Sequence, residues 1–228
     1  MSSTGTRPAL VLQHGPLGPP ALLGEWLQER AIPYVVHHVH EDLSLPAPDG
    51  YRFVASLGSA KSPSAQDDPE VAAELALLRR AVERDVPVLG LCFGGQALAQ
   101  VLGGRVEPSP VEELGWHRVE TAEPETVSPG PWLQWHYERF TLPPRAEELA
   151  RSSVGPQAFR HGVHVGTQFH PESTMDVVAG WARHDAERLA ARGIADGEAL
   201  VFEGREHADA AREAAFRLFD AFARRAGV

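Results

Sequence analysis

The sequence has few of the residues that several large classes of protein need. It contains one cysteine in 228 residues, so no disulfide can form within the chain. Lysine and arginine number 21 against 31 acidic residues, and the net charge of −10 leaves no basic surface of the kind that binds nucleic acid. No apolar run approaches the roughly 20 residues needed to span a bilayer. A disulfide scaffold, a nucleic-acid partner and a membrane-spanning protein are therefore not expected.

Signals for targeting, nucleotides and metals are also missing. The opening MSSTGTRPALVLQHG passes from polar residues into a short apolar run, without a charged and apolar leader. There is no G-x-x-x-x-G-K-[ST] phosphate loop, and nothing else suggests an ATP-dependent domain. His37, His38 and His40 lie close together, but no carboxylate or cysteine completes a known ligand spacing. We expect a cytoplasmic protein without a metal or another cofactor.

Short apolar runs alternate with helical patterns over the first 104 residues. Strands are predicted over 9–13, 34–39, 51–57 and 86–91, and helices over about 21–30, 69–84 and 96–102. The run at 86–91, VPVLGL, is typical of a strand buried on both faces of a parallel sheet. The alternation predicts an α/β fold, with a mostly parallel sheet and helices on both faces.

The pattern changes after residue 105. Short strands joined by proline-rich turns predict a small antiparallel patch appended to the main sheet, whose last strand ends at His170 and re-enters that sheet. Two amphipathic helices are predicted over 171–191 and 208–226. With 43% hydrophobic residues the chain can bury a substantial core, and residues 1–228 are expected to form a single domain.

The single cysteine, Cys92, lies within VPVLGLCFGGQ and allows two interpretations. A free cysteine is often a small buried hydrophobe. However, Gly90-x-Cys92-x-Gly94 has the spacing of a nucleophile elbow, a sharp strand-to-helix turn that needs small neighbours. The start of a helix favours the thiolate, and the backbone N–H of Phe93 would point toward the same place and could stabilise an oxyanion. The spacing favours a nucleophile.

A nucleophilic thiol needs a base and a group that orients the base. The stretch GTQFHPE provides His170 and, two residues later, Glu172. If its strand lies next to the one before Cys92, His170 emerges at the same edge of the sheet, and Glu172 can reach the other ring nitrogen. In isolation a His-x-Glu pair is equally consistent with ordinary surface residues. Together, the two stretches indicate a catalytic site.

GLCFGGQ followed by TQFHPE resembles the class I, or triad, glutamine amidotransferases, with their signature G-x-C-x-G-x-Q and a later F-H-P-E. The resemblance extends from VLQHG to the HPE segment and is greatest for stand-alone domains akin to that of GMP synthase. It implies a Rossmann-like sheet with a Cys92-His170-Glu172 triad. It also implies hydrolysis of the glutamine side-chain amide through a glutamyl thioester, with ammonia passing to a synthetase partner or another acceptor.

The resemblance implies roles for two further residues. Gly58, in SLGSAKS, corresponds to the second oxyanion donor beside Phe93, although Leu57 replaces a glycine that relatives often carry. Gln96 lies one helical turn after Cys92 and would contact the glutamine substrate. An ordinary turn glycine and a solvated helical glutamine are the alternatives.

Two later stretches also resemble parts of the family. Leu114, Gly115 and Trp116, in ELGW, resemble the strand whose backbone binds the amino-acid end of glutamine. The stretch WLQWHYERF, which contains His136, resembles a W-H-x-x-x-F pattern of stand-alone relatives, where this histidine can lie near the mouth of the pocket.

Two other functions are compatible with the same motifs. The triad could hydrolyse a γ-glutamyl peptide or amine in place of free glutamine. The chain could also be a non-catalytic binding or regulatory module that keeps the fold, although intact triad residues argue against it. The sequence does not identify the acceptor of the ammonia.

Overall fold

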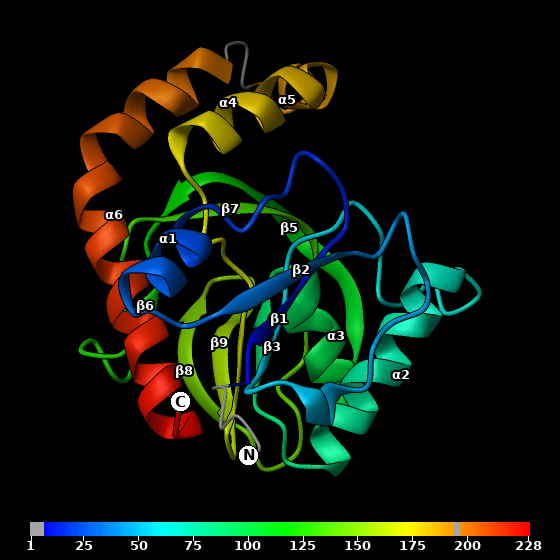
Figure 1. Cartoon of the computed structure of the whole chain (residues 1–228). Helices are drawn as coiled ribbons and strands as arrows, with labels where there is room; N and C mark the ends of the chain where they lie inside the picture. Colours follow the sequence, from blue (N-terminus) through cyan, green and yellow to red (C-terminus); the bar gives the residue numbers. More distant parts are fainter. Residues whose placement is uncertain (1–6, 194–196) are drawn as a thin grey trace.

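The computed structural model describes residues 7–193 and 197–228 and shows strands and helices alternating through the first half of the chain (Figure 1). In order these elements are β1 (Ala9–Gln13), α1 (Ala21–Glu29), β2 (Tyr34–His38), the 3₁₀ helix η1 (Pro48–Gly50), β3 (Val54–Ser56), α2 (Pro69–Glu83), β4 (Val88–Leu91) and α3 (Phe93–Val101). Each strand and helix predicted for this half is present. The strand predicted over 51–57 is shorter, because the chain turns through η1 and joins the sheet only at Val54.

Strands dominate the middle of the chain and helices its end. The elements are β5 (Val106–His117), β6 (Glu120–Thr121), β7 (Trp132–Phe140), β8 (Glu147–Ser152), β9 (Gly155–His161), β10 (His164–Thr167), α4 (Met175–His184), α5 (Ala186–Ala191) and α6 (Gly197–Ala226). The change of character predicted after residue 105 is confirmed.

The main sheet has eight strands in the order β2-β1-β3-β4-β10-β9-β8-β6. The five strands from β2 to β10 pair in parallel, and β9, β8 and β6 continue the sheet in antiparallel pairs. This confirms the predicted fold, including the return of the last strand to a place beside β4. One detail differs: β5 and β7 pair only with each other, in a separate two-stranded sheet.

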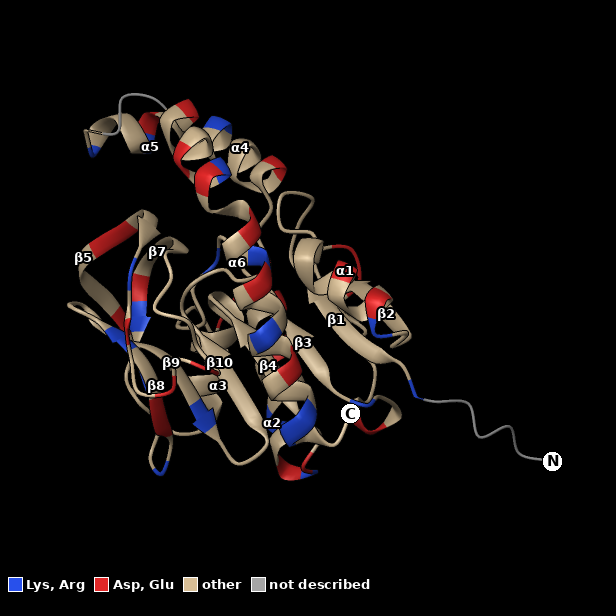
Figure 2. Ribbon diagram, turned by 90° about the vertical axis from the view of Figure 1, so that its left-hand side faces the viewer, with Lys and Arg blue, Asp and Glu red and all other residues tan. Residues whose placement is uncertain are grey.

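Helices cover both faces of the sheet, with α1 and α6 on one side and α2 and α3 on the other (Figure 1). The alternation of side chains along β1 creates the two cores. Ala9 and Val11 pack with α1 and α6, whereas Leu10 and Leu12 pack with α2 and α3. Figure 2 shows that charged residues lie along the helices and outer strands, whereas β1, β3 and β4 carry none. This uncharged centre matches the apolar runs of the sequence.

The helix predicted over 171–191 is interrupted. It begins only at Met175 and breaks at Asp185 into α4 and α5. The Asp185 carboxylate accepts hydrogen bonds from Trp135 Nε1 at 2.8 Å and from the Tyr137 hydroxyl at 3.1 Å. Partners 50 and 48 residues away therefore hold the chain at the break, which helical periodicity does not reveal.

The last helix, α6, begins at Gly197, eleven residues before the predicted start at 208. Its first turns pack on β5 and α4. A Cβ added to Gly204 would lie 2.6 Å from Trp116 Cζ2 and 2.5 Å from Met175 Sδ, so the absence of a side chain allows this close approach. The first turns of α6 carry many charged residues, and their contact with the distant residues Trp116 and Met175 stabilises them as a helix.

Two expectations concern the chain as a whole. None of the helices in the described residues is both long and apolar enough to cross a membrane. The single domain over 1–228 and the cytoplasmic location stay predictions.

Candidate active site

Cys92 stands between β4 and α3 in a conformation that few non-glycine residues adopt, with φ 51° and ψ −105°. Such strained backbone occurs where the surrounding structure enforces it, often at reactive side chains. The Cys92 N–H donates a hydrogen bond of 2.9 Å to Thr167 O at the end of β10. The cysteine thus lies in a sharp strand-to-helix turn at the carboxyl edge of the sheet, as the elbow spacing predicts.

The glycines around Cys92 allow this turn. A Cβ on Gly90 would lie 2.4 Å from Gly94 O, and one on Gly94 would lie 2.1 Å from Ser56 O. Gly95 cannot carry a side chain either, because an added Cβ would lie 2.2 Å from Thr167 O. All three distances are far below van der Waals contact with backbone atoms, so no larger residue fits. The glycine-rich sequence is a requirement of the fold at this point.

His170 lies beside Cys92, three residues after β10 ends at Thr167. The prediction that the strand continues to His170 is wrong, because the Thr167 carbonyl bonds to Cys92 and the chain then leaves the sheet. The His170 N–H donates to Leu133 O at 2.9 Å, which anchors the residue on β7. The predicted position at the carboxyl edge is nevertheless correct.

The His170 ring is held by Glu172. Nδ1 lies 2.8 Å from Glu172 Oε1, so the other nitrogen, Nε2, is left for the thiol of Cys92. Burial lowers the pKa of His170, but the charges of Cys92 and Glu172 and their hydrogen bonds raise it by more, to about 10. A proton is therefore held on this ring at neutral pH, next to the sulfur.

Gly58 and Phe93, the two predicted oxyanion donors, both adjoin the cysteine. A Cβ on Gly58 would lie 2.8 Å from His170 Cε1 and 3.9 Å from Cys92 Cβ, so the backbone of Gly58 passes close to both side chains. Phe93 is the first residue of α3, where backbone N–H groups have no partner within the helix. The arrangement is compatible with two N–H donors near the sulfur.

Gln96 is buried close to Cys92. Its Nε2 donates to Glu138 O at 3.0 Å and to Gln168 Oε1 at 3.3 Å. Gln168 Nε2 in turn lies 3.9 Å from Cys92 Sγ. The solvated alternative for Gln96 is excluded, and Gln168 is a neighbour of the sulfur that the motif comparison did not single out, although it lies within TQFHPE.

Comparison with known sequences identifies the family. Residues 36–179 match the sequence model of the family described as glutamine amidotransferase class-I, which is more than half of the chain. The chain belongs to this family. The match includes Cys92, His170 and Glu172, so these residues lie in the part of the amidotransferase that defines the family.

Individual relatives agree with this assignment. The glutamine amidotransferase-like protein YfeJ of Salmonella typhimurium is 29% identical over 186 residues, 73% of this chain and 76% of YfeJ. The glutamine-hydrolyzing GMP synthase of Thermomicrobium roseum is 41% identical over 99 residues, 40% of this chain but only 19% of the synthase. The chain thus matches about a fifth of that enzyme. A crystal structure of a glutamine amido transferase from Methylobacillus flagellatus is 27% identical, with a TM-score of 0.88 over 97% of this chain and 96% of that chain.

Leu114, Gly115 and Trp116 of the amidotransferase lie in β5, opposite Trp135, Gln134 and Leu133 of β7. The carbonyl of Trp135 is 4.0 Å from Cys92 Sγ, so β5 lies one strand away from the nucleophile. Trp116 Nε1 donates to Leu200 O at 3.0 Å, which connects this strand to α6. The role of these three residues in substrate binding stays a prediction.

His136 is not exposed at the surface. It is buried between β5, β7 and β9, with Nε2 3.0 Å from Glu113 Oε2 and Nδ1 3.0 Å from Glu138 O. Gln157 Nε2 also donates to Glu113 Oε2, at 2.7 Å. Both ring nitrogens therefore have partners within the fold.

The three residues of the predicted triad are enclosed. Cys92, His170 and Glu172 are 6%, 5% and 4% exposed. The indole of Trp181 from α4 lies 4.6 Å from the His170 ring and donates to Leu17 O at 2.7 Å, so α4 and the loop after β1 meet above the histidine. The sequence contains no local signal for this cover, since Trp181 and Leu17 are 164 residues apart.

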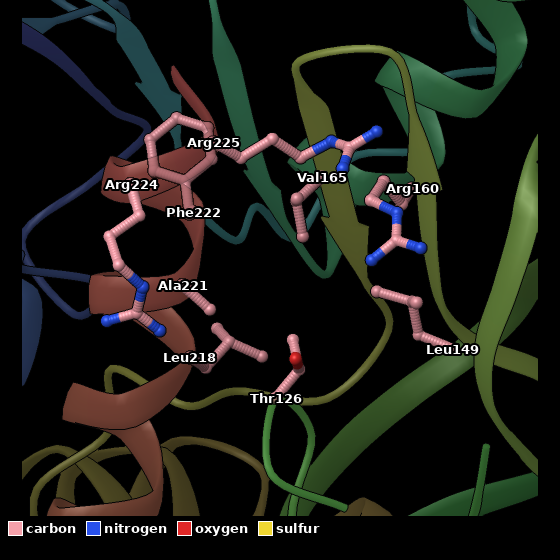
Figure 3. A pocket seen from close by; sticks show the side chains of 9 residues that line it. All are labelled: Thr126, Leu149, Arg160, Val165, Leu218, Ala221, Phe222, Arg224 and Arg225. Carbon is pink, nitrogen blue, oxygen red and sulfur yellow. The ribbon is translucent and has the colours of Figure 1, made fainter. Parts of the chain in front are cut away.

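A hollow of about 350 Å³ opens elsewhere, between α6 and the strands β9 and β10 (Figure 3). Arg160 and Val165 line it near the start of β10, whereas Cys92 lies beyond the opposite end of that strand. Arg160 is paired with Glu123 and Glu147, so its charge is compensated. The hollow is separate from the triad.

Proposed function

We propose that this class I amidotransferase hydrolyses the side-chain amide of glutamine through Cys92, His170 and Glu172. One observation carries the proposal: the thiol stands in a strained elbow beside a histidine whose other nitrogen is 2.8 Å from a buried carboxylate. Nucleophile, base and orienting group are the three elements that acyl transfer by a cysteine requires.

In the first half of the reaction, the Cys92 sulfur attacks the carboxamide carbon of glutamine. The carbonyl oxygen becomes an oxyanion, which accepts hydrogen bonds from the N–H groups of Gly58 and Phe93. His170 gives its proton to the nitrogen, the C–N bond breaks, and ammonia leaves. A glutamyl thioester on Cys92 remains.

In the second half, neutral His170 removes a proton from water, and the oxygen attacks the thioester carbon. The C–S bond breaks, glutamate leaves, and the sulfur and the protonated ring return to their initial state. Glu172 holds the ring through Nδ1 in both halves and stabilises its charge. The sum is glutamine plus water giving glutamate plus ammonia.

Gln96 and the β5 residues Leu114, Gly115 and Trp116 hold the substrate in this scheme. Gln96 lies one turn after the nucleophile and already contacts Gln168 beside the sulfur. Ammonia then passes to an acceptor on a synthetase partner, a suggestion that derives from the similarity to glutamine-hydrolyzing GMP synthases.

The direct test is to measure glutamate and ammonia released from glutamine by the wild type, Cys92→Ala and Cys92→Ser. Equal amounts of both products are expected from the wild type, and a loss of at least about 10³-fold from either variant. A matched control is the thermal midpoint, which should change little because the thiol is small. Undiminished hydrolysis by Cys92→Ala contradicts the mechanism.

The same assay with γ-glutamyl peptides and amines decides between substrates. Free glutamine is expected to give the highest kcat/KM, since the enclosed triad suits a small leaving group. A higher kcat/KM for a γ-glutamyl conjugate would assign the triad to that hydrolysis instead.

A further inference from the structure

A third buried histidine–carboxylate pair lies next to the two proposed oxyanion donors. His14 follows β1 and Glu74 belongs to α2, and their side chains are 4% and 1% exposed. His14 Nε2 contacts Glu74 Oε2, and His14 Nδ1 lies 3.1 Å from Gly58 O. The motif comparison assigned neither residue a role.

The partners of the His14 ring define its protons. Gly58 O can only accept a hydrogen bond, so Nδ1 carries a proton. Nε2 faces a carboxylate, which is also an acceptor when ionised. Burial lowers the pKa of His14, but Glu74 and the Gly58 carbonyl raise it by more, so the pKa lies above its ordinary value. Acceptors at both nitrogens thus favour the protonated ring, in which Nδ1 donates to Gly58 O and Nε2 to Glu74.

The same ring also touches the second donor. Its centroid lies 4.8 Å from that of Phe93, in an edge-on contact. The other oxygen of Glu74 accepts a hydrogen bond from Ser56 Oγ at the end of β3, two residues before Gly58. One carboxylate thus joins the ends of β1 and β3, and one ring contacts both Gly58 and Phe93.

Glycine rotates freely about φ and ψ, so a peptide next to Gly58 needs an external restraint to hold its direction. An oxyanion hole works only when its donors are already in place, since small displacements weaken it strongly. We propose that His14 is a positioning residue: with Glu74 holding its ring, it anchors the Gly58 carbonyl and so restricts rotation at Gly58, which keeps the N–H of Gly58 aimed at the same point as that of Phe93. The inference rests on the proposed function, because an oxyanion forms only if Cys92 attacks a carbonyl carbon.

Two variants separate the two hydrogen bonds of the ring. In His14→Asn the amide nitrogen takes the place of Nδ1 and can still donate to Gly58 O. In His14→Gln the amide nitrogen takes the place of Nε2 and can reach Glu74 but not Gly58 O. We expect kcat for glutamine to stay within about threefold in His14→Asn. We expect it to fall about 10- to 100-fold in His14→Gln, less than the 10²–10³-fold typical of deleting one donor. KM should change little in either variant.

The rate at which iodoacetamide alkylates Cys92 distinguishes positioning of the oxyanion donors from a general structural role of His14. A general distortion of the site would change this rate, whereas a loss of donor positioning alone would not. The sulfur displaces iodide from carbon, so no oxyanion forms and the positions of the two donors do not matter. The alkylation rate is therefore expected to be equal in the wild type and both variants. Equal losses of kcat in the two variants, or alkylation that falls in parallel with kcat, would overturn the proposal.

Binding of 5-oxopentanoate, an aldehyde with the five-carbon chain and the carboxylate of glutamine but no α-amino group, makes the test independent of turnover. The Cys92 sulfur adds to the aldehyde carbon, His170 keeps the proton that it already holds, and the new oxyanion occupies the same hole. The aldehyde should protect Cys92 from iodoacetamide at about tenfold higher concentration in His14→Gln than in the wild type or His14→Asn. If the wild type hydrolyses glutamine and His14→Gln does so equally well, only this inference fails. If the wild type neither hydrolyses glutamine nor binds the aldehyde, the proposed function fails as well.

Discussion

Two buried histidines lie at the two ends of β10 and differ in almost everything except burial. His164 begins the strand and is 4% exposed, and His170 follows its end and is 5% exposed. Burial, and to a smaller extent the charge of His161, lower the pKa of His164 to about 4, because the opposing effect of Asp85 is smaller. The pKa of His170, with Cys92 and Glu172 beside it, is raised to about 10. Burial alone keeps a histidine neutral, and the neighbouring acids make it a charged proton donor.

The pair of His136 and Glu113 refines this comparison. His136 is as buried as His170 and also has a carboxylate at Nε2, but its Nδ1 is bonded to Glu138 O. No ring nitrogen is left for a reacting group. A buried histidine–carboxylate pair becomes a candidate base only where the second nitrogen faces a nucleophile, as it does beside Cys92.

The largest effect should come from replacing His170, with a replacement of His164 at the other end of β10 as the comparison. His170→Asn removes the proton donor and is expected to lower kcat for glutamine by about 10³-fold, within the usual range for general acid–base groups. His164→Asn should leave kcat within about twofold, because the residue lies at the far end of the strand. A steady-state assay checks both, and a loss of similar size in His164→Asn would break the comparison.

The next largest effect is expected from replacing Glu172, the carboxylate that contacts His170. Because protonated His170 donates to the leaving nitrogen, kcat/KM of the wild type should stay high through neutral pH and decline as pH approaches about 10. Glu172→Gln removes the negative charge that helps to raise this pKa, so the decline should begin at a lower pH and kcat should fall about 10- to 100-fold. A pH profile of kcat/KM measures the shift, and an unchanged alkaline limb would show that Glu172 does not act on His170.

His136→Ala should affect stability instead of chemistry. It leaves the Glu113 carboxylate buried with fewer partners, at a cost of about 3 kcal/mol, or roughly 6–12 °C in thermal midpoint. Alkylation of Cys92 should proceed at the wild-type rate in the folded variant. Differential scanning calorimetry and a thiol-labelling assay provide the two measurements, and a drop in labelling without destabilisation would be the opposite of the expected result.

The smallest effect is the pH dependence that His164 adds to stability. Its pKa is about 4 in the folded chain and ordinary in the unfolded chain, so the unfolded state binds the proton first as pH falls. The free energy of unfolding should therefore decrease between about pH 6.5 and pH 4, by up to roughly 3 kcal/mol from this group. His164→Asn should remove this contribution. Urea unfolding at pH 7 and pH 4.5 measures the change in the free energy of unfolding for the wild type and for the variant, and the difference between these two changes is the contribution of His164. An equal change in both proteins would contradict the prediction.

Much of the candidate site could be predicted because its requirements are local. The glycines at 90, 94 and 95 are forced by backbone atoms of the elbow and of the strands beside it, so they accompany Cys92 in the sequence. His170 and Glu172 are two residues apart and bond directly. Alternating apolar runs likewise predicted the parallel strands. Such features depend on spacing along the chain, which the sequence states explicitly.

Other features could not be predicted, because distant residues create them. α6 begins early since Gly204 fits against Trp116, and the preceding helix breaks where Asp185 meets Trp135 and Tyr137. β5 and β7 separate from the main sheet, although their sequences resemble those of its other strands. Periodicity describes a segment by itself and contains no information about such partners.

The sequence by itself determined the family, the parallel core and the two motifs that carry the proposed catalytic residues, because each of these is encoded in short local patterns along the chain. Only the tertiary structure decided which buried histidines are charged, that Trp181 covers His170, and that His14 contacts both Gly58 and Phe93. A pKa depends on burial and on charges within a few ångströms, and those neighbours come from segments up to tens of residues apart. Chemistry of this kind exists only once the chain has folded.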